Sequence, residues 1–376
     1  MAQQLIGIML NLNLLKQINT GKTRFENILY YEKAAKSHGV VPCFFHLKAV
    51  DLADGRVSAY IKDHKSGIYK KRRVPIPHII HNRAMLLKKT SHRIIDKLIA
   101  KGYVVFNHRT RYGKLSINKM LMENEQIVPH LPDTARADEK TVRSFMQKYG
   151  SIILKPNSSS IGLGILKLEK KGRMWVLTYP KTKFGKTGKI KFRKRLPELL
   201  LRKMKNRTYL VQERIPLATY EGRPFDLRVS VQRNLFGEWQ VTGIAGRVAA
   251  KNKYVTNVAQ GGRVFSLPEL LEGHSHLDVE TVAGNVIKIS TQIAEELSMR
   301  LPNLADIGLD IGVDQNGFPY FIECNARDLR ISFKKGNMLD IWESAFENPI
   351  GYACFLMKQL KDDRKEDENM KQENAG

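Results

Sequence analysis

A hairpin pattern near the carboxyl end of the chain places oxygen ligands where they could hold a metal ion. Asn316 and Gly317 separate two apolar runs, which is a strong β-hairpin signal. With these residues as the turn, or with a four-residue loop at 315–318, Asp310 lies opposite Glu323, and Asn325 shares the face of Glu323. Facing carboxylates in an apolar hairpin are costly without a cation. Three oxygen donors without His or Cys thiolate predict Mg²⁺. The alternatives are an exposed edge with scattered acids, or a bulge that moves the pairing by one residue.

A second pattern, at residues 155–164, has the residue types that bind phosphate. A residue before proline is kept out of the helical region, so Lys155 is expected to be extended at the end of a strand. The loop that follows can fold over a bound phosphate, although an ordinary surface loop is the alternative. The residues with hydroxyls or accessible amides that can donate to phosphate are Ser158, Ser159, Ser160, Gly162 and Gly164. Neither Gly-Lys-Thr sequence is a Walker P-loop, because the earlier glycine is absent.

Arginine suits contact with a transferring phosphoryl group, and Arg247 lies between these two patterns. Arg228 lies nearby in the sequence, in an alternating strand pattern at residues 225–231. Asp226 shares the face of Arg228, so a structural ion pair between these two residues is the alternative.

The charge of the chain predicts an anionic partner. Lys and Arg number 63 against 37 Asp and Glu, which gives a net charge of +26. Such an excess attracts nucleotides, nucleic acids and acidic polymers. Residues 181–207 contain twelve basic residues and one acidic residue, and a solvated surface is the alternative for this segment. Nucleic acid is disfavoured, because zinc-finger spacing and an RNA-binding aromatic signature are absent and aromatic residues make up only 8%.

The order of patterns predicts two main units. Strand patterns at residues 5–10, 40–47, 76–80 and 104–106 alternate with helical patterns at 25–37 and 91–100, which predicts an α/β domain over residues 1–114. A second unit is expected over residues 115–360, and the charged segment 361–376 reads as disordered. No run reaches the roughly 18 apolar residues of a membrane helix. The first residues lack a basic signal-peptide region, so cytoplasmic synthesis is expected.

Taken together, the order of these motifs resembles the ATP-grasp ligases over about residues 115–360. The order is a basic strand end, a Ser/Gly loop, Val-Gln-Glu at 211–213, Asp-Leu-Arg at 226–228, a Gly-Gly turn at 261–262, and then Asp310 and Glu323. The segments at 79–83 and 130–134 and the basic insert are more closely similar to the YheC/YheD-type proteins associated with bacterial endospore coats.

The resemblance implies an α/β (α+β) fold, with a Rossmann-like pre-ATP-grasp domain before a two-lobed ATP-grasp domain. The lobes would cover about residues 115–210 and 211–360. The implied cofactors are ATP and one or two Mg²⁺ ions, with Mn²⁺ as an alternative metal. Lys155 would contact the phosphates under the loop at 158–164. The remaining implied roles are adenine binding by Gln212, Glu213, Arg214 and Ile215, metal binding by Asp310, Glu323 and Asn325, and phosphoryl or acyl phosphate contact by Arg228, Arg247 and Asn257.

The function that the resemblance implies is ATP-dependent joining of a carboxylate to an amine through an acyl phosphate, in spore formation or on the spore coat. The expected substrate is an anionic small molecule or an acidic polymer, and spore coat proteins are candidate partners. The alternatives are a non-catalytic, ATP-binding component of the spore coat and, third, a nucleic acid-binding protein.

Overall fold

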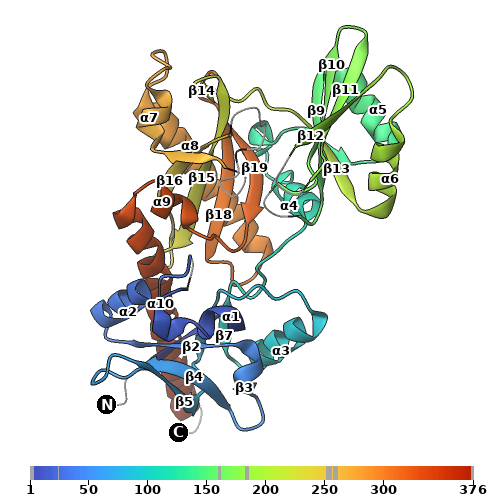
Figure 1. Ribbon diagram of the computed structural model, residues 1–376. Helices are drawn as coiled ribbons and strands as arrows, with labels where there is room; N and C mark the ends of the chain where they lie inside the picture. Colours follow the sequence, from blue (N-terminus) through green and yellow to red (C-terminus); the bar gives the residue numbers. More distant parts are fainter. Residues whose placement is uncertain are drawn as a thin grey trace.

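The chain is described by a computed structural model that covers residues 4–23, 25–159, 162–182, 186–250, 256 and 261–373. Three β-sheets with helices packed against them make up the molecule (Figure 1). Within these described ranges, none of the helices combines the length and the apolar character that a bilayer-spanning helix needs.

The first sheet is built from the N-terminal part of the chain. Its strand order is β3-β4-β2-β1-β6-β7, with β5 beside β4. β1 pairs in parallel with β2 and β6, and β6 with β7. Ile6, Ile8 and Phe44 are fully buried, as expected for parallel strands covered on both faces. The strands are β1 Leu5–Met9, β2 Val41–Phe45, β3 Val50–Asp51, β4 Arg56–Lys62, β5 Tyr69–Pro75, β6 Ile79–Asn82 and β7 Val104–Phe106. The helices are α1 Leu12–Leu15, α2 Ile28–Ser37 and α3 Lys89–Ala100, with 3-10 turns at Ile18–Thr20 and Leu47–Ala49.

The second sheet is antiparallel and follows the order β12-β11-β10-β9-β13-β8. Helices α5 and α6 cover one face, where Val142 and Leu200 join Ile152 and Leu154 in an apolar cluster. Side chains alternate along a strand, so Lys155 lies on the opposite face. The strands are β8 Thr134–Arg136, β9 Ser151–Pro156, β10 Leu166–Lys171, β11 Met174–Pro180, β12 Thr187–Phe192 and β13 Tyr209–Glu213. The helices are α4 Lys114–Leu121, α5 Glu139–Lys148 and α6 Glu198–Asn206, with a 3-10 turn at Val128–His130.

The third sheet follows the order β17-β16-β15-β18-β19, with β14 beside β15. On one face, α8 packs Val286 and Ile289 against Val229 and Leu309. The strands are β14 Thr219–Tyr220, β15 Arg223–Arg233, β16 Trp239–Val248, β17 Arg263–Phe265, β18 Asp306–Val313 and β19 Pro319–Asn325. The helices are α7 Leu267–Leu271, α8 Val279–Arg300, α9 Ile331–Lys335 and α10 Leu339–Glu373.

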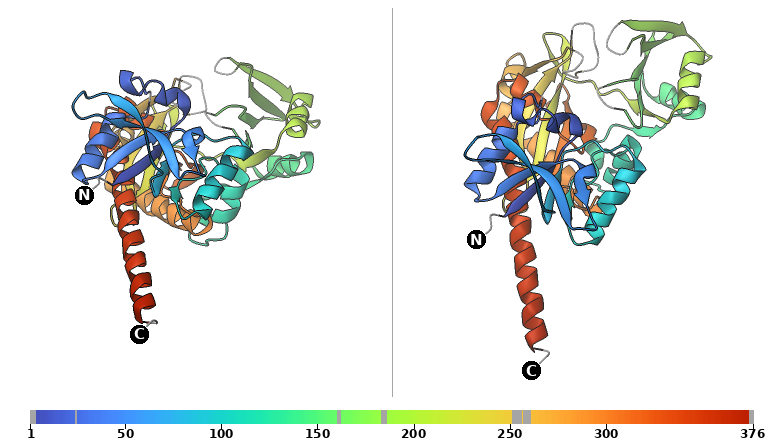
Figure 2. Two further views of the ribbon diagram at one scale, coloured as in Figure 1. Left: turned by 90° about the horizontal axis from the view of Figure 1, so that it is seen from below. Right: turned by 60° about the horizontal axis from the view of Figure 1, so that its bottom comes forward.

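Helix α10 joins the third sheet to the first. Its residues Trp342 and Phe346 share an apolar cluster with Tyr31 of α2 and Phe44 of β2. The prediction of disorder from residue 361 onward is wrong for the part that the structure describes, because α10 continues to Glu373. The packed first half supplies the costly helix nucleus, and the Lys, Glu and Gln residues that follow are good helix formers. Figure 2 shows this last part of α10 extending away from the sheets.

A sealed cluster of ion pairs also joins the first and third sheets. Arg83, just after β6, lies 2.8 Å from Glu26 and 3.1 Å from Asp306 of β18. Arg330 contacts the same Asp306 oxygen at 2.5 Å. These four side chains are at most 1% exposed. Burial would raise the pKa of Asp306, but Arg330, His81 and Arg83 together outweigh it and hold that pKa well below its usual value.

Candidate active site

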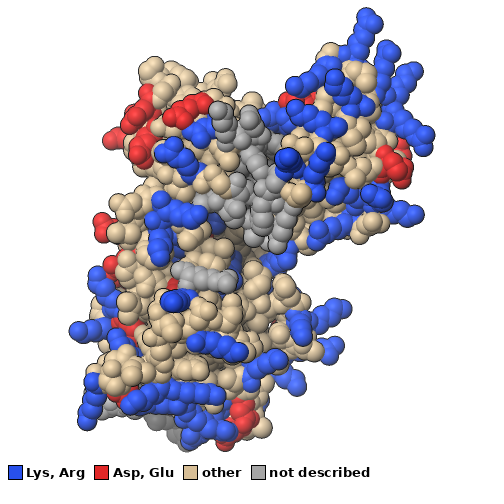
Figure 3. Space-filling model, in the orientation of Figure 1, with Lys and Arg blue, Asp and Glu red and all other residues tan. Residues whose placement is uncertain are grey.

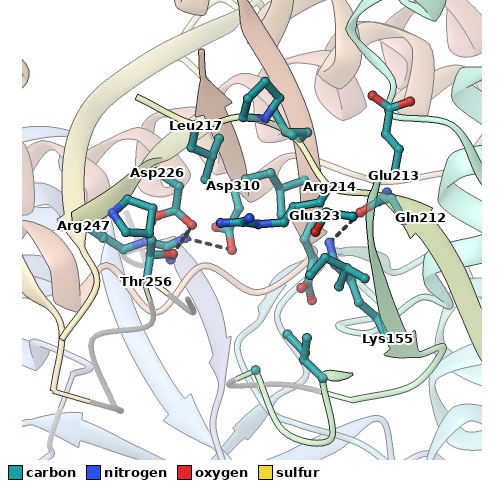
Figure 4. Close-up of a pocket in the computed structure, with 18 of the residues that line it drawn as sticks. Lys155, Gln212, Glu213, Arg214, Leu217, Asp226, Arg247, Thr256, Asp310 and Glu323 are labelled. Atoms are coloured by element: carbon teal, nitrogen blue, oxygen red, sulfur yellow. Dashed lines mark hydrogen bonds and ion pairs between the residues drawn. The ribbon is translucent and has the colours of Figure 1, made fainter. Parts of the chain in front are cut away.

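A cavity of about 490 Å³ is lined by residues of both the second and the third sheet. β9 and β13 line it from the second sheet, and β15, β16, β18 and β19 from the third (Figure 4). Charged side chains from both sheets point into this space, which makes it the candidate active site.

The β18–β19 hairpin contributes the facing carboxylates. Asp310 pairs directly with Glu323, as the sequence predicts. The route to this register differs from the expected one. The Asp314 carboxylate accepts hydrogen bonds from the amides of Asn316 and Phe318, each at 2.9 Å, which stabilises a three-residue turn. This turn is one residue longer than the predicted two-residue turn and one residue shorter than the alternative four-residue loop, so neither expected turn forms. A register shift between Asp310 and Ile311 then compensates for that extra residue and restores the predicted pairing.

Asp310 is held by two arginines. Its Oδ1 accepts a hydrogen bond from Arg228 Nε at 2.9 Å, and its Oδ2 lies 3.0 Å from a terminal nitrogen of Arg247. Burial would raise the pKa of Asp310, but the two guanidinium groups outweigh it and hold the pKa below its usual value. Asp310 therefore remains a carboxylate in the apolar hairpin.

Glu323 and Asn325 complete the oxygen donors on this side of the cavity. Glu323 forms an ion pair of 3.0 Å with Lys114, and the buried Nδ2 of Asn325 has no hydrogen-bond partner. Both residues line the same cavity as Asp310. Among the described residues, no group of three or more His, Cys, Asp or Glu is arranged to hold a metal ion, and the third oxygen donor beside these two carboxylates is the Asn325 amide. Two carboxylates and an amide oxygen fit Mg²⁺, which takes few protein ligands and completes its shell with water and phosphate.

The predicted alternative of an Asp226–Arg228 ion pair is wrong. Asp226 binds Arg247 instead, at 2.7 and 2.8 Å, and Arg228 binds Asp310 and Asp328. Asp226 lies directly opposite Arg247 in the sheet, and Arg228 directly opposite Asp310. Directly opposed residues are closer than residues two apart on one strand, so the cross-strand partners form the pairs.

Lys155 lies at the second-sheet side of the cavity. Its side chain is buried, and its Nζ donates a hydrogen bond of 2.7 Å to Gln212 Oε1 (Figure 4). Burial lowers the pKa of Lys155 to about 8, although Glu323 and Asp310 act in the opposite direction. The four residues of the predicted adenine segment, Gln212, Glu213, Arg214 and Ile215, all line the cavity.

The loop after β9 only partly reaches the cavity. Gly162 lines it, with φ +66°, whereas Ser158, Ser159 and Gly164 are not among the lining residues. The Ser159 hydroxyl bonds back to the Pro156 carbonyl at 3.4 Å, so it is directed to its own backbone. Ser160 and Asn257 lie outside the described residues.

Sequence reasoning missed Lys114. It begins α4, and its Nζ binds both the Ser159 carbonyl at 2.9 Å and Glu323 at 3.0 Å. Lys114 and Glu323 are 209 positions apart, and no motif surrounds the lysine. The cation therefore connects the two halves of the site through a contact that only the fold creates.

The fold and the site together define an ATP-grasp protein. The model of the YheC/D-like ATP-grasp family matches residues 102–356, which is most of the chain. The chain therefore belongs to the YheC/D-like ATP-grasp family, as the sequence motifs indicate.

Two Bacillus subtilis (strain 168) proteins are among its relatives. The endospore coat-associated protein YheD is 25% identical over 335 residues, which cover 84% of this chain and 71% of YheD. The endospore coat-associated protein YheC is 24% identical over 286 residues, 74% of this chain and 77% of YheC.

Two similar solved structures support the mixed α/β ATP-grasp fold. D-cycloserine synthetase DcsG has a TM-score of 0.53 at 8% identity, covering 91% of this chain and 98% of DcsG. The ATP-grasp ligase PsnB, complexed with a minimal precursor, has a TM-score of 0.51 at 14% identity, covering 91% of this chain and 100% of PsnB.

Proposed function

We propose that the chain is an ATP- and Mg²⁺-dependent ligase that joins a carboxylate to an amine. The observation that carries this proposal is the single cavity that collects a buried lysine, two arginines and two facing carboxylates from two sheets. Membership of the ATP-grasp family supports it.

The nucleotide would lie between the second and third sheets. Adenine would pack against residues 212–215, all of which line the cavity. Lys155 would move from Gln212 to the α- and β-phosphates, since a phosphate offers this buried cation a charged acceptor. The loop at 158–164 would cover the phosphates. Lys114 already contacts this loop and Glu323, so it would lie near the same phosphates.

Asp310, Glu323 and Asn325 would hold one or two Mg²⁺ ions. The chemistry supplied by an ion held there would be neutralisation of negative charge on the phosphates. If Asp310 bound the metal, Arg228 and Arg247 would each lose one carboxylate partner and could contact the γ-phosphate instead. Their remaining partners, Asp328 and Asp226, would keep both arginines beside the cavity. Asn257 and Gly261–Gly262 would contribute to contact with the acyl phosphate, the role that the order of the sequence motifs implies.

The reaction would proceed in two steps. The substrate carboxylate would attack the γ-phosphorus of ATP, the bond to the bridging oxygen would break, and ADP would leave with formation of an acyl phosphate. The amine would then attack the acyl carbon, lose a proton and expel inorganic phosphate. Arg228 and Arg247 would stabilise the negative charge of both steps, and the enclosed cavity would position the reactants.

The remaining details are part of the same proposal. Residues 1–114 would form a Rossmann-like pre-ATP-grasp domain, and residues 115–210 and 211–360 the two lobes. The substrate would be an anionic small molecule or an acidic polymer. The protein would act in spore formation, with spore coat proteins as partners, because the relatives YheD and YheC are endospore coat-associated.

A non-catalytic, ATP-binding coat component is the second candidate. One observation favours it: both carboxylates of the hairpin already have cationic partners, Asp310 with two arginines and Glu323 with Lys114. An acidic pair that is neutralised in this way could persist without a metal.

The two candidates differ in ATP turnover. The test measures release of ADP and phosphate with pools of amino acids, peptides and cell-wall precursors. We expect one pool to stimulate release, and Glu323→Ala to reduce it about 100-fold or more while the fold is kept. Glu347→Ala, on α10 outside the cavity, is the control and should leave release unchanged. Nucleotide binding without release in any pool would support the coat component instead.

A further inference from the structure

Two basic segments of the molecule differ in how their charges are neutralised. On β5, Lys70 and Arg72 lie 2.8 and 3.3 Å from Asp63, and Arg73 binds Asp51 and Asp54. In residues 181–207, no basic residue that the structure describes forms an ion pair. The ion pairs around the second sheet are instead formed by Arg143, Lys148 and Lys167. Figure 3 shows Lys and Arg gathered over the second sheet and its helices, at the upper right. The second segment is therefore the one with charge available for a partner.

A groove of about 330 Å³ concentrates this charge beside α6. Its cationic lining residues are Arg202, Lys203 and Arg207, and no acidic residue is among the lining residues that the structure describes. Arg202 and Arg207 are exposed, and Lys203 is half-buried. Cations at a concave surface without acidic neighbours attract an anion more strongly than the same cations on a convex surface.

The groove adjoins the candidate active site through the loop after β9. Gly164 lines the groove, whereas Gly162 and Ile165 line the cavity. A Cβ at Gly164 would lie 3.0 Å from the Pro156 ring, and its φ of +79° also favours glycine. Described residues of this loop thus face the cavity and the groove at neighbouring positions. Arg207 also reaches the loop, since its guanidinium donates to the Ser158 carbonyl at 3.5 Å.

The chemistry of the groove favours carboxylates over nucleic acid. Single-stranded nucleic acids are bound by stacking bases on accessible aromatic rings. The aromatic residue in the described lining, Tyr209, is 3% exposed, and its hydroxyl donates to the Gly164 carbonyl at 3.2 Å. Its ring is therefore not available for stacking, while arginine pairs readily with carboxylates.

We propose that this groove binds an acidic peptide, which supplies the carboxylate for the ligation proposed above. Neighbouring Asp or Glu side chains of the peptide pair with Arg202, Lys203 and Arg207, and the peptide runs along the loop after β9, whose described residues face both the groove and the cavity. The assignment as substrate rests on the proposed function, whereas binding of the peptide does not.

The test measures binding of a fluorescein-labelled peptide of about ten glutamates to the full chain by anisotropy, without nucleotide. R202Q/K203Q/R207Q should weaken binding about tenfold, because exposed ion pairs are individually weak but act together. K70Q/K71Q/R72Q removes the same charge from β5 and should change affinity less than twofold. Thermal unfolding of both variants checks that the fold is kept.

Two results would overturn the inference. One is an equal loss in both variants, which would mean that only net charge matters. The other is an oligothymidylate of equal length that binds as tightly as the peptide and loses as much affinity in the groove variant. Peptide binding that depends on the groove, in a protein without ATP turnover, would support the binding site while contradicting the proposed function.

Discussion

Two clusters of ion pairs lie on the same face of β15 and β18, one in the middle of these strands and one at the end where β18 begins. In the middle, Arg228 lies opposite Asp310, beside the cavity. At the end, Gln232 lies opposite Asp306, within the sealed cluster. Asp306 is 0% exposed and Asp310 is 9% exposed. The same pattern of polar residues at every second position therefore occurs in two environments, one fully buried and one beside a cavity.

The difference shows what makes a buried charge available for chemistry. Around Asp306 the partners Arg83 and Arg330 come from segments outside the sheet, and they close the space on that side. Around Asp310 the arginines come from the sheet itself, and a cavity of about 490 Å³ stays open beside them. We infer that the first cluster holds the sheets together and the second binds ligand.

The largest loss of folding stability is expected from Asp306→Asn. This change leaves Arg83 and Arg330 buried with one acidic partner fewer, and breaking a buried pair costs about 3–5 kcal/mol. The urea midpoint of unfolding should fall accordingly. Asp54→Asn removes an exposed partner of Arg73 and should cost less than about 1 kcal/mol. Equal midpoints for the two variants would contradict the structural role of the sealed cluster.

Asp310→Asn should reduce ATP turnover strongly and folding stability only slightly. Arg228 keeps Asp328, and Arg247 keeps Asp226, so the loss of stability should be smaller than for Asp306→Asn. ATP turnover should fall about 100-fold or more, because a metal ligand and an arginine partner are lost together. Calorimetric unfolding and ADP release measure the two quantities. Full turnover in this variant would remove Asp310 from the metal site.

The pH dependence of ATP binding should identify Lys155. Its pKa is lowered to about 8 by burial, so the free protein carries this charge below pH 8 and loses it above. ATP affinity should therefore fall by about fivefold as pH rises from 8 to 9. The charged groups near this lysine are Glu323, Lys114, Asp310 and Asp226. In Lys155→Arg, titration calorimetry should show a flat profile over the same range; the same fall in that variant would assign the titration to another group.

The smallest effect on ATP turnover and stability is expected from Gly308→Ala, at a position between the two clusters. A Cβ there would lie 2.8 Å from Asp328 Oδ1 and 3.1 Å from a terminal nitrogen of Arg228. Gly308→Ala should displace Arg228 and lower ATP turnover several-fold, with a change of less than about 1–2 kcal/mol in stability. Gly284→Ala, where a Cβ meets nothing within 4 Å, is the matched control. If both variants turned over ATP equally, Arg228 would not need Asp328 to position it.

Much of the local structure could be predicted from the sequence. The strand–helix alternation of the first sheet follows from hydrophobic periodicity, and the cap of α5 at Asp138 follows from residue type. The pairing of Asp310 with Glu323 was predicted correctly with the wrong turn. The three-residue turn and the bulge shift the register in opposite directions, and neither is marked by composition alone.

The sequence by itself determined several groups of the site: a lysine at a strand end, facing carboxylates on a hairpin, and two arginines between these patterns. These depend on residue type and on neighbours a few positions away. Tertiary structure alone decided the partners of each charge, including Lys114 with Glu323 and Arg83 with Asp306. Such contacts join segments about 200 residues apart, and they form because strands pair side by side and a buried charge requires the nearest opposite charge.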